Sequence, residues 1–262
     1  MIGARAIMAL LTPRPGGDAG QMTAHRELSL GPRGAKHISG GAQMAAIIAL
    51  LEQETGQPLI QASGQFLGSP KTGEHFTLRI DDLRKGKSIS LADVKLLVGT
   101  DVRVRAAASL GARSDIGAHQ WLIAPSAPPP DECPPLPFIR SDPGDLHRNL
   151  DIRLAHDPRG DPRGELVFWV GWNGGGQVPS AFLALIADYL PEAVHFNIGR
   201  PAGAVSLDNA IRIIGTAETS WLLCHTKLSG IANGLFHGEM AIYSVEGGLL
   251  AVAGQSGVVR LL

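Results

Sequence analysis

The chain has 262 residues, of which 44% are hydrophobic, and its formal net charge is −1 at pH 7. This length suffices for one large domain or two of ordinary size, and the small net charge argues against bulk binding to nucleic acid or to a membrane surface. No window approaches the roughly 18 apolar residues of a membrane span, and the apolar run at 6–11 is too short for a signal peptide. We therefore expect a soluble, cytoplasmic protein.

The first half predicts one buried helix followed by four strands. Residues 1–39 favour an opening strand or two, with glycine-rich connections at 16–17 and 31–34. Residues 42–51 are apolar on every face except at Gln43, and Gly56 is a typical helix stop. A helix without a polar face must be surrounded by other structure. Strand-like segments at about 59–68, 74–83, 88–98 and 101–110 could surround it, with a glycine-containing turn at 84–87.

A proline-rich segment separates this half from a second one. Prolines crowd residues 124–137, and their density excludes a helix or a central strand there, so we expect a stiff linker that continues through the irregular stretch 142–164. A strand is predicted at 165–172. A second apolar helix from about Pro179 to Asp188 comes next, followed by strands at about 204–214, 220–230, 234–245 and 249–261.

The order of one apolar helix and then four strands therefore occurs twice. This pattern predicts an α+β protein of two similar units, in each of which an antiparallel sheet wraps around a long apolar helix. The predicted division is 1–123 for the N-terminal unit, 124–164 for the linker and 165–262 for the C-terminal unit.

Asp188 is the first candidate for chemistry, because it ends an apolar helix. A carboxylate there meets a desolvation penalty and the negative end of its own helix dipole. One interpretation is that the helix simply emerges into solvent at this point. The other is a carboxylate at the edge of an apolar cavity, where perturbed acids carry out catalysis. The periodicity does not distinguish the two.

Two further polar residues lie on predicted strands of the second half. Gln255 interrupts an apolar final strand, and the adjacent Gly254 allows close approach of another backbone or a ligand. A solvated glutamine is the alternative for Gln255, and an ordinary strand serine is the alternative for Ser206.

Other motifs give little support for a different chemistry. The chain lacks a G-x-S-x-G nucleophile turn and the HExxH spacing of a zinc enzyme. The basic turn with Arg84 and Lys87 could contact a phosphate-rich ligand or could be a solvated hairpin tip. The two cysteines, Cys133 and Cys224, are too few for a disulfide framework; one bridge is possible, and two reduced thiols fit a cytosolic protein better.

Four segments resemble the acyl-CoA thioesterases of the double-hotdog type, the medium-to-long-chain thioesterase II family. These segments are Ser39-Gly40-Gly41-Ala42-Gln43, similar to a Gly-Gly-Gln helix start; the hairpin 82–88, similar to an arginine–x–glycine–basic–serine motif; 206–211, similar to a Ser/Thr–aliphatic–Asp strand motif; and 251–260, similar to an Ala-Ser-x-x-Gln-Glu-Gly-x-x-Arg tail. The resemblance covers essentially the whole chain.

This resemblance implies a tandem (double) hotdog fold and hydrolysis of acyl-CoA thioesters to free acid and CoA, without metal or redox cofactor. The family's catalytic trio falls on Asp188, Ser206 and Gln255. In this interpretation, Asp188 polarises a water molecule that attacks the thioester carbonyl directly. Substrate contacts are expected at Gly40, Gly41, Arg84 and Lys87. Acyl-CoA is the expected partner, with no nucleic acid or membrane, and further association into a homo-oligomer is expected.

The sequence departs from the family pattern at several positions. Ala42 stands where the family's first-helix glutamine is usual, Asn209 follows Asp208 in place of a histidine, and Ser256 replaces a glutamate. Two alternatives remain open. A hotdog hydratase is disfavoured because Ala193 stands where its Asp-x4-His signature would need a histidine after Asp188. A non-catalytic acyl-CoA or acyl-carrier binding module is the other.

Overall fold

The computed structural model describes residues 2–15, 19–31, 36–113, 117–138, 142–160 and 163–261. The helices are α1 (Gly3–Leu11), α2 (Gly40–Thr55), α3 (Leu146–Asn149), α4 (Ser180–Ala187) and α5 (Leu190–Ile198), with short 3₁₀ turns η1 (Arg26–Leu28), η2 (Pro130–Glu132) and η3 (Pro158–Gly160). The strands are β1 (Arg14–Pro15), β2 (Ala19–Thr23), β3 (Ser29–Leu30), β4 (His37–Ile38), β5 (Leu59–Phe66), β6 (His75–Arg84), β7 (Ile89–Val98), β8 (Asp101–Gly111), β9 (Ile152–His156), β10 (Glu165–Gly171), β11 (Ala202–Ser206), β12 (Asp208–Ile213), β13 (Trp221–Ala232), β14 (Leu235–Ser244) and β15 (Leu249–Leu261).

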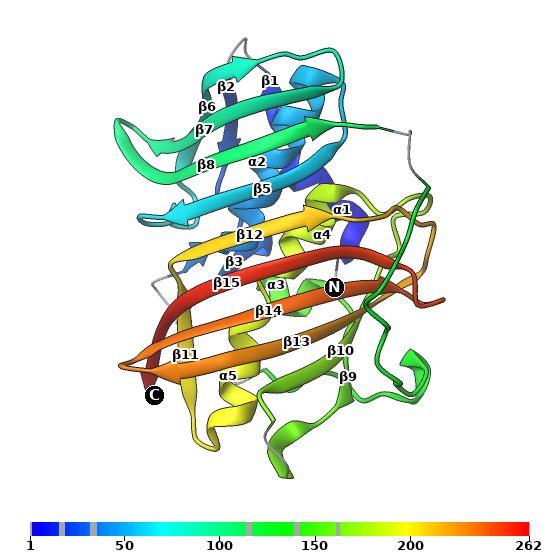
Figure 1. Ribbon diagram of the computed structural model, residues 1–262. Helices are drawn as coiled ribbons and strands as arrows, with labels where there is room; N and C mark the ends of the chain where they lie inside the picture. The colour runs from blue at the N-terminus through cyan, green and yellow to red at the C-terminus, as the bar shows by residue number, and fades with distance from the viewer. Residues whose placement is uncertain are drawn as a thin grey trace.

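Within the described residues, most strands join one antiparallel sheet of 13 strands, in the order β1-β2-β6-β7-β8-β5-β12-β15-β14-β13-β10-β9, with β11 paired to β15. The two halves of this order mirror each other about β5 and β12, which pair antiparallel at Ser63 and Ala210. Figure 1 shows the sheet curving around α2 in the upper half and around α4 and α5 in the lower half. This arrangement is a tandem hotdog, as the resemblance implied, with the two expected sheets merged into one.

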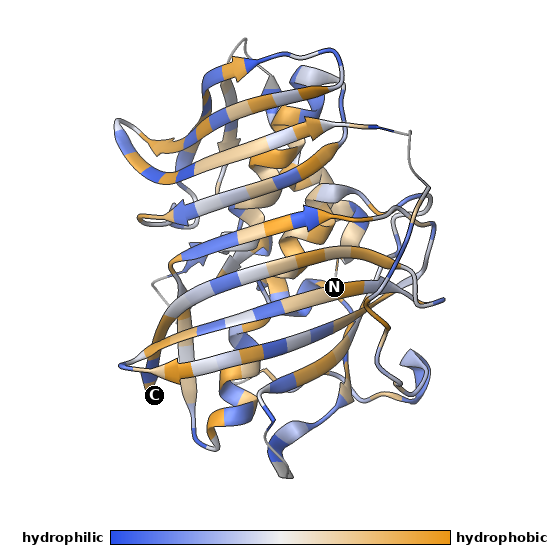
Figure 2. Ribbon diagram, viewed as in Figure 1, coloured by the Kyte–Doolittle hydropathy of each residue, from blue (hydrophilic) through white to orange (hydrophobic). Residues whose placement is uncertain are grey.

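The core lies between the sheet and the central helices. Burial alternates along the strands, and the hydropathy in Figure 2 alternates with it, because successive side chains of a strand point to opposite faces. Helix α2 is buried on nearly all sides, as its apolar sequence predicts. It begins after Ser39, whose Oγ accepts the amide of Ala42 at 3.1 Å, and ends at Gly56 with φ 65°.

Four parts of the chain differ from the prediction, and one of them is the strand expected at about 204–214, which is divided into β11 and β12. Residues 3–11 form helix α1 in place of a strand, because Ala4, Ile7 and Leu11 recur at helical spacing and bury one face. The second apolar helix ends where expected, with Asp188 capping α4, but a further helix that was not predicted, α5, begins at Leu190 with Pro191 in its first turn. The irregular stretch 142–164 contains α3 and β9, and β9 extends the sheet at β10. The glycines at 16–17 and most of 31–34 lie outside the described residues. The division of the chain at 123/124 and 164/165 stays a prediction.

Candidate active site

Asp188 lies where the C-terminal end of α4 meets the N-terminal end of α2. The two helices pack so closely there that a Cβ atom on Gly41 would lie 2.4 Å from the carbonyl oxygen of Leu185 and 2.8 Å from the Cβ of Asp188. Real Cβ atoms do not approach other atoms so closely, so only glycine fits at position 41. The glycine pair at the start of α2 therefore allows the acid of one half to reach the helix of the other half.

Three donors surround the Asp188 carboxylate. The backbone N–H of Gly41 donates to Oδ2 at 2.7 Å, and the Oγ of Ser206 donates to Oδ1 at 3.1 Å. The Nε2 of Gln255 donates to the same Oδ1 at 2.6 Å and to Ser206 Oγ at 2.5 Å. The trio expected from the resemblance is thus brought together, although its members are far apart in the sequence.

The strands explain how Ser206 and Gln255 reach this position. Ser206 is the last residue of β11 and pairs with Gly257 of β15. Gln255 belongs to the inward row of β15, in which alternate residues from Ala251 to Gly257 are buried, and its side chain is only 1% exposed. Gln255 is therefore not solvated, while the catalytic role of Ser206 and Gln255 stays a prediction.

The electrostatics of Asp188 combine opposing effects. Burial raises the pKa of the Asp188 carboxyl above the ordinary aspartate value, because the protein surroundings solvate a charge less well than water. The hydrogen bonds from Gly41, Gln255 and Ser206 lower the pKa in part. The N-terminal end of α2 also favours a negative charge, which offsets the unfavourable end of α4. The net effect is a raised pKa of the carboxyl, and the three hydrogen bonds only partly compensate for the cost of burying its ionised form.

Asp188 and Ser206 line a pocket of about 570 Å³, called here the Asp188 pocket. Its wall combines residues from both halves, namely Leu30, Gly31, His37, Ile38, Ser39, Gly40, Phe66, Gly68, Ser69, Leu146, His147, Leu185, Tyr189, Pro191, Glu192, Ala204, Val205 and Arg260. The carboxylate therefore faces a cavity with a largely apolar wall. Of the two interpretations of Asp188, this position supports a carboxylate at the edge of an apolar cavity and not a helix end in bulk solvent.

The four expected substrate contacts divide into two groups. Gly40 lines the Asp188 pocket and Gly41 contacts Asp188 directly. Arg84 and Lys87 are exposed at the hairpin between β6 and β7 and line no part of this pocket. Arg84 instead borders a separate pocket with Asp82 and Leu91. Their substrate role stays a prediction, without support from position. Glu192 and His147 are pocket residues that the sequence reasoning missed; the only available signal was the spacing of four residues between Asp188 and Glu192.

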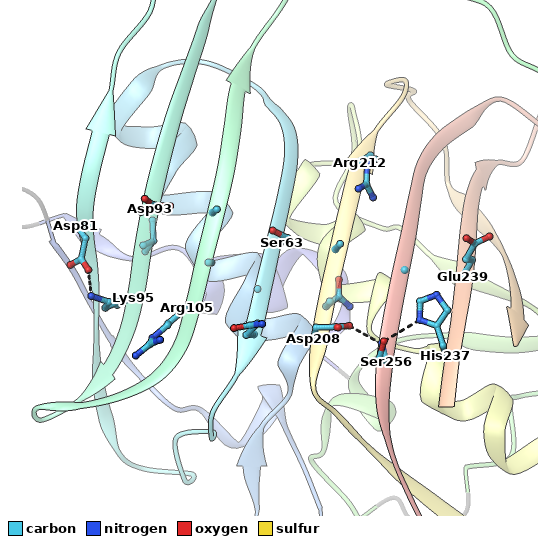
Figure 3. Close-up of a pocket in the computed structure, with 18 residues that line it drawn as sticks. Ser63, Asp81, Asp93, Lys95, Arg105, Asp208, Arg212, His237, Glu239 and Ser256 are labelled. Atoms are coloured by element: carbon cyan, nitrogen blue, oxygen red, sulfur yellow. Dashed lines mark hydrogen bonds and ion pairs between the residues drawn. The ribbon is translucent and has the colours of Figure 1, made fainter. Parts of the chain in front are cut away.

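A larger groove of about 770 Å³ lies on the outer face of the sheet, where β7, β8, β5, β12, β15 and β14 run side by side. Figure 3 shows its charged side chains standing on the strands. Some of them have partners: Lys95 pairs with Asp81, Asp208 accepts the amide of Ser256 at 2.7 Å, and His237 bonds to the Ser256 hydroxyl at 3.0 Å. The groove has the character of a charged, solvated sheet face, and the candidate site with Asp188 is separate from it.

In the described residues of the N-terminal half, no equivalent of the trio is present at the corresponding positions of α2 and β8. Residues 45–51, which complete the buried part of α2, are all apolar. The inward-facing residues of β8 correspond to the row that holds Gln255 in β15, and they are Val104, Ala106, Ala108 and Leu110. The candidate catalytic side chains therefore come from the second half of the pseudo-symmetric molecule, and the first half contributes Gly40 and Gly41 to the site.

Cys133 and Cys224 are both free and buried. Among the described residues, no group of three or more His, Cys, Asp or Glu side chains is arranged to hold a metal ion. None of the described helices has the length and apolar character that crossing a membrane requires.

The fold and this site define a double-hotdog protein with one candidate catalytic centre, and comparisons with known proteins identify its family. The model of the acyl-CoA thioesterase N-terminal domain matches residues 31–111, and that of the acyl-CoA thioesterase C-terminal domain matches residues 130–259. The chain belongs to the acyl-CoA thioesterase family and is a thioester hydrolase.

Solved structures agree with this assignment. A proposed thioesterase from Novosphingobium aromaticivorans is 30% identical, with a TM-score of 0.87, and the match covers 95% of this chain and 98% of that one. A hot dog protein of unknown function from Alicyclobacillus acidocaldarius is 19% identical, with a TM-score of 0.82 and 99% of each chain covered. An acyl-CoA thioesterase II from Mycobacterium marinum is 18% identical, with a TM-score of 0.76 and 98% of each chain covered. No curated protein matches.

Proposed function

We propose that this thioesterase hydrolyses acyl-CoA to the free acid and CoA by direct attack of water, with Asp188 as the general base. Asp188 takes one proton from the water as the hydroxide oxygen adds to the thioester carbonyl carbon. The tetrahedral intermediate then expels the CoA thiolate, and the proton held by Asp188 passes to the sulfur. The observation that carries this proposal is the half-buried carboxylate, hydrogen-bonded on both oxygens and facing a cavity.

Ser206 and Gln255 orient Asp188 and, with it, the attacking water. Both donate to Oδ1, so they stabilise the ionised form that a base requires. The tight contact between Gln255 and Ser206 also restricts the side-chain rotamers of both residues. The amide nitrogen of Gln255 is assigned to this position because an oxygen there would face the carboxylate.

The oxyanion is stabilised at the start of α2 in this proposal. Gly40 is the first residue of the helix and lines the pocket beside Asp188. First-turn amides have no partner within their own helix, and the helix dipole favours negative charge at this end. We assign the Gly40 N–H as a donor to the developing oxyanion, a role that in other enzymes supplies about 10²–10³-fold in rate.

The test is release of free thiol from a panel of saturated acyl-CoA substrates of increasing chain length. Asp188→Asn keeps the shape of the side chain and removes the base, so kcat is expected to fall by about 10²–10⁴-fold. Gln255→Ala and Ser206→Ala are expected to lower kcat by smaller factors, because they act through Asp188. Asp101→Asn, a change at an exposed carboxylate on β8, is the control and is expected to keep the wild-type rate.

Two outcomes would contradict the proposal. Full activity in both Asp188→Asn and Gln255→Ala would refute the trio even if hydrolysis is real. Binding of acyl-CoA without thiol release at any chain length would instead support the binding-module alternative.

We further propose a cytoplasmic homo-oligomer that binds neither nucleic acid nor membrane. The two buried, unbridged cysteines support a reducing compartment. The terminal strands β1 and β9 of the sheet leave edges that are available for association. Light scattering of the purified protein measures the mass of the assembly.

A further inference from the structure

The Asp188 pocket contains a second carboxyl group, which the hydrolysis mechanism does not use. Glu192 lies on α5, four residues after Asp188, and lines the same cavity. Asp188 and Tyr189 form the break between α4 and α5, and Glu192 lies in the first turn of α5 that follows this break. Its side chain is 21% exposed, which leaves the carboxyl accessible from the pocket and largely enclosed by protein.

Glu192 has no charged or strongly hydrogen-bonded partner in the described part of the chain. The Nε2 of His147 lies 3.7 Å from its Oε1, which is too long for a hydrogen bond. His147 is itself held by other groups: its Nδ1 lies 3.3 Å from the Tyr189 hydroxyl, and its ring stacks on Phe138 at 3.9 Å between centroids. The carboxyl therefore retains hydrogen-bonding capacity toward the pocket.

The protonation states strengthen this conclusion. Burial lowers the pKa of His147 to about 3, so the imidazole is neutral at physiological pH and provides no counter-charge. Burial raises the pKa of Glu192 to about 7, as expected for a carboxyl without a neighbouring cation. A saturated acyl chain packed against this group would cover a polar group without satisfying it, which is unfavourable.

We propose that Glu192 determines acyl specificity by binding a hydroxyl group on the acyl chain, several bonds beyond the thioester carbonyl. This inference rests on the proposed function, because it assumes that the acyl group occupies the Asp188 pocket. A hydroxyl both donates and accepts hydrogen bonds, so it matches Glu192 in either protonation state.

The test measures binding by calorimetry, with CoA thioethers that cannot be hydrolysed. One ligand is S-hexyl-CoA, and the others carry a single hydroxyl on carbon 3, 4, 5 or 6 of the hexyl chain. Wild type is expected to bind at least one hydroxylated ligand about tenfold or more tightly than S-hexyl-CoA. Glu192→Leu is expected to abolish this preference and to bind S-hexyl-CoA more tightly than wild type. Glu192→Gln keeps hydrogen-bonding groups and is expected to retain most of the preference.

Glu246→Leu, in the exposed turn between β14 and β15, is the matched control and is expected to bind like wild type. Equal affinity of wild type for all five ligands would overturn the inference. An equal loss for every ligand in Glu192→Leu would also overturn it, since that result indicates a structural role or contact with the CoA part. The readout is binding, so the proposed function is decided separately by thiol release from hexanoyl-CoA.

Discussion

Asp188 lies between two helix ends of opposite polarity, one from each half of the molecule. The end of α4 disfavours its negative charge and the start of α2 favours it, while Gly41, Ser206 and Gln255 donate hydrogen bonds. A base with a raised pKa accepts a proton more readily in the transition state, provided that it is ionised at the working pH. Burial beside the pocket raises the pKa of Asp188, and the three hydrogen-bond donors favour its ionised form.

This balance predicts the pH dependence of hydrolysis. Asp188 acts as a base only when ionised, so kcat/KM is expected to fall as the pH falls through its pKa. Because burial raises that pKa, the midpoint is expected above the ordinary aspartate value of 3.8. Gln255→Ala removes a donor to the carboxylate, so its acid limb should move to higher pH. The measurement is kcat/KM against pH for both proteins.

The same profile separates the two pocket carboxyls. Glu192, with a pKa of about 7, can add a second inflection. That inflection should be absent in Glu192→Gln, whereas the limb that belongs to Asp188 should remain. A shift of the acid limb to lower pH in Gln255→Ala would contradict the assigned hydrogen bonds.

At the scale of elements, the contact between α2 and α4 is the central feature, and it depends on Gly41. Gly41→Ala places a methyl group against the backbone of Leu185, so the helices must move apart. Overpacking of this kind lowers the free energy of unfolding by about 1–3 kcal/mol. The movement would also carry the Gly41 N–H away from Asp188, and a displacement of about 1 Å typically costs about 100-fold in rate.

Denaturant unfolding and steady-state kinetics check this prediction. Gly117→Ala is the control, because a Cβ atom there meets no other atom within 4 Å, and it should leave both quantities unchanged. Wild-type activity in Gly41→Ala would show that the position of α2 does not control the site.

At the scale of the whole molecule, the two halves share a fold and differ in chemistry. The interior of the first half is apolar at residues 45–51 of α2 and along β8, whereas the second half carries Asp188 and Gln255. We therefore expect one acyl-CoA site per chain, although the sheet has nearly two-fold symmetry. Calorimetric titration with S-hexyl-CoA should give one ligand per chain. A stoichiometry of two would contradict this reading of the first half.

Much of this architecture could be predicted from local sequence. The strands from Leu59 to Gly111 and from Trp221 to Leu261 were predicted nearly in full, because alternation and glycine turns are local signals. A strand was predicted in place of helix α1, although Ala4, Ile7 and Leu11 lie at helical spacing in that apolar run. The break at Tyr189 and the pairing of β5 with β12 depend on contacts between distant segments.

The candidate site shows the same limit. The sequence pattern indicated Asp188, Ser206 and Gln255 separately, as single polar residues, and only the family resemblance placed them in one catalytic group. The Gly41 amide is 147 residues away from Asp188 in sequence, so no periodicity could reveal the bond between them. Glu192 has no motif, and its environment emerges only when α3 and α5 are brought together.

The two halves of the sheet meet where β5 pairs with β12. Asp188 belongs to one half, and its amide donor, Gly41, belongs to the other. The geometry of the candidate site therefore depends on the contact between the two halves, and neither half could form it alone. A small displacement of one half relative to the other would stop turnover while nearly every strand stays intact. Mildly denaturing conditions should therefore abolish activity before the sheet unfolds.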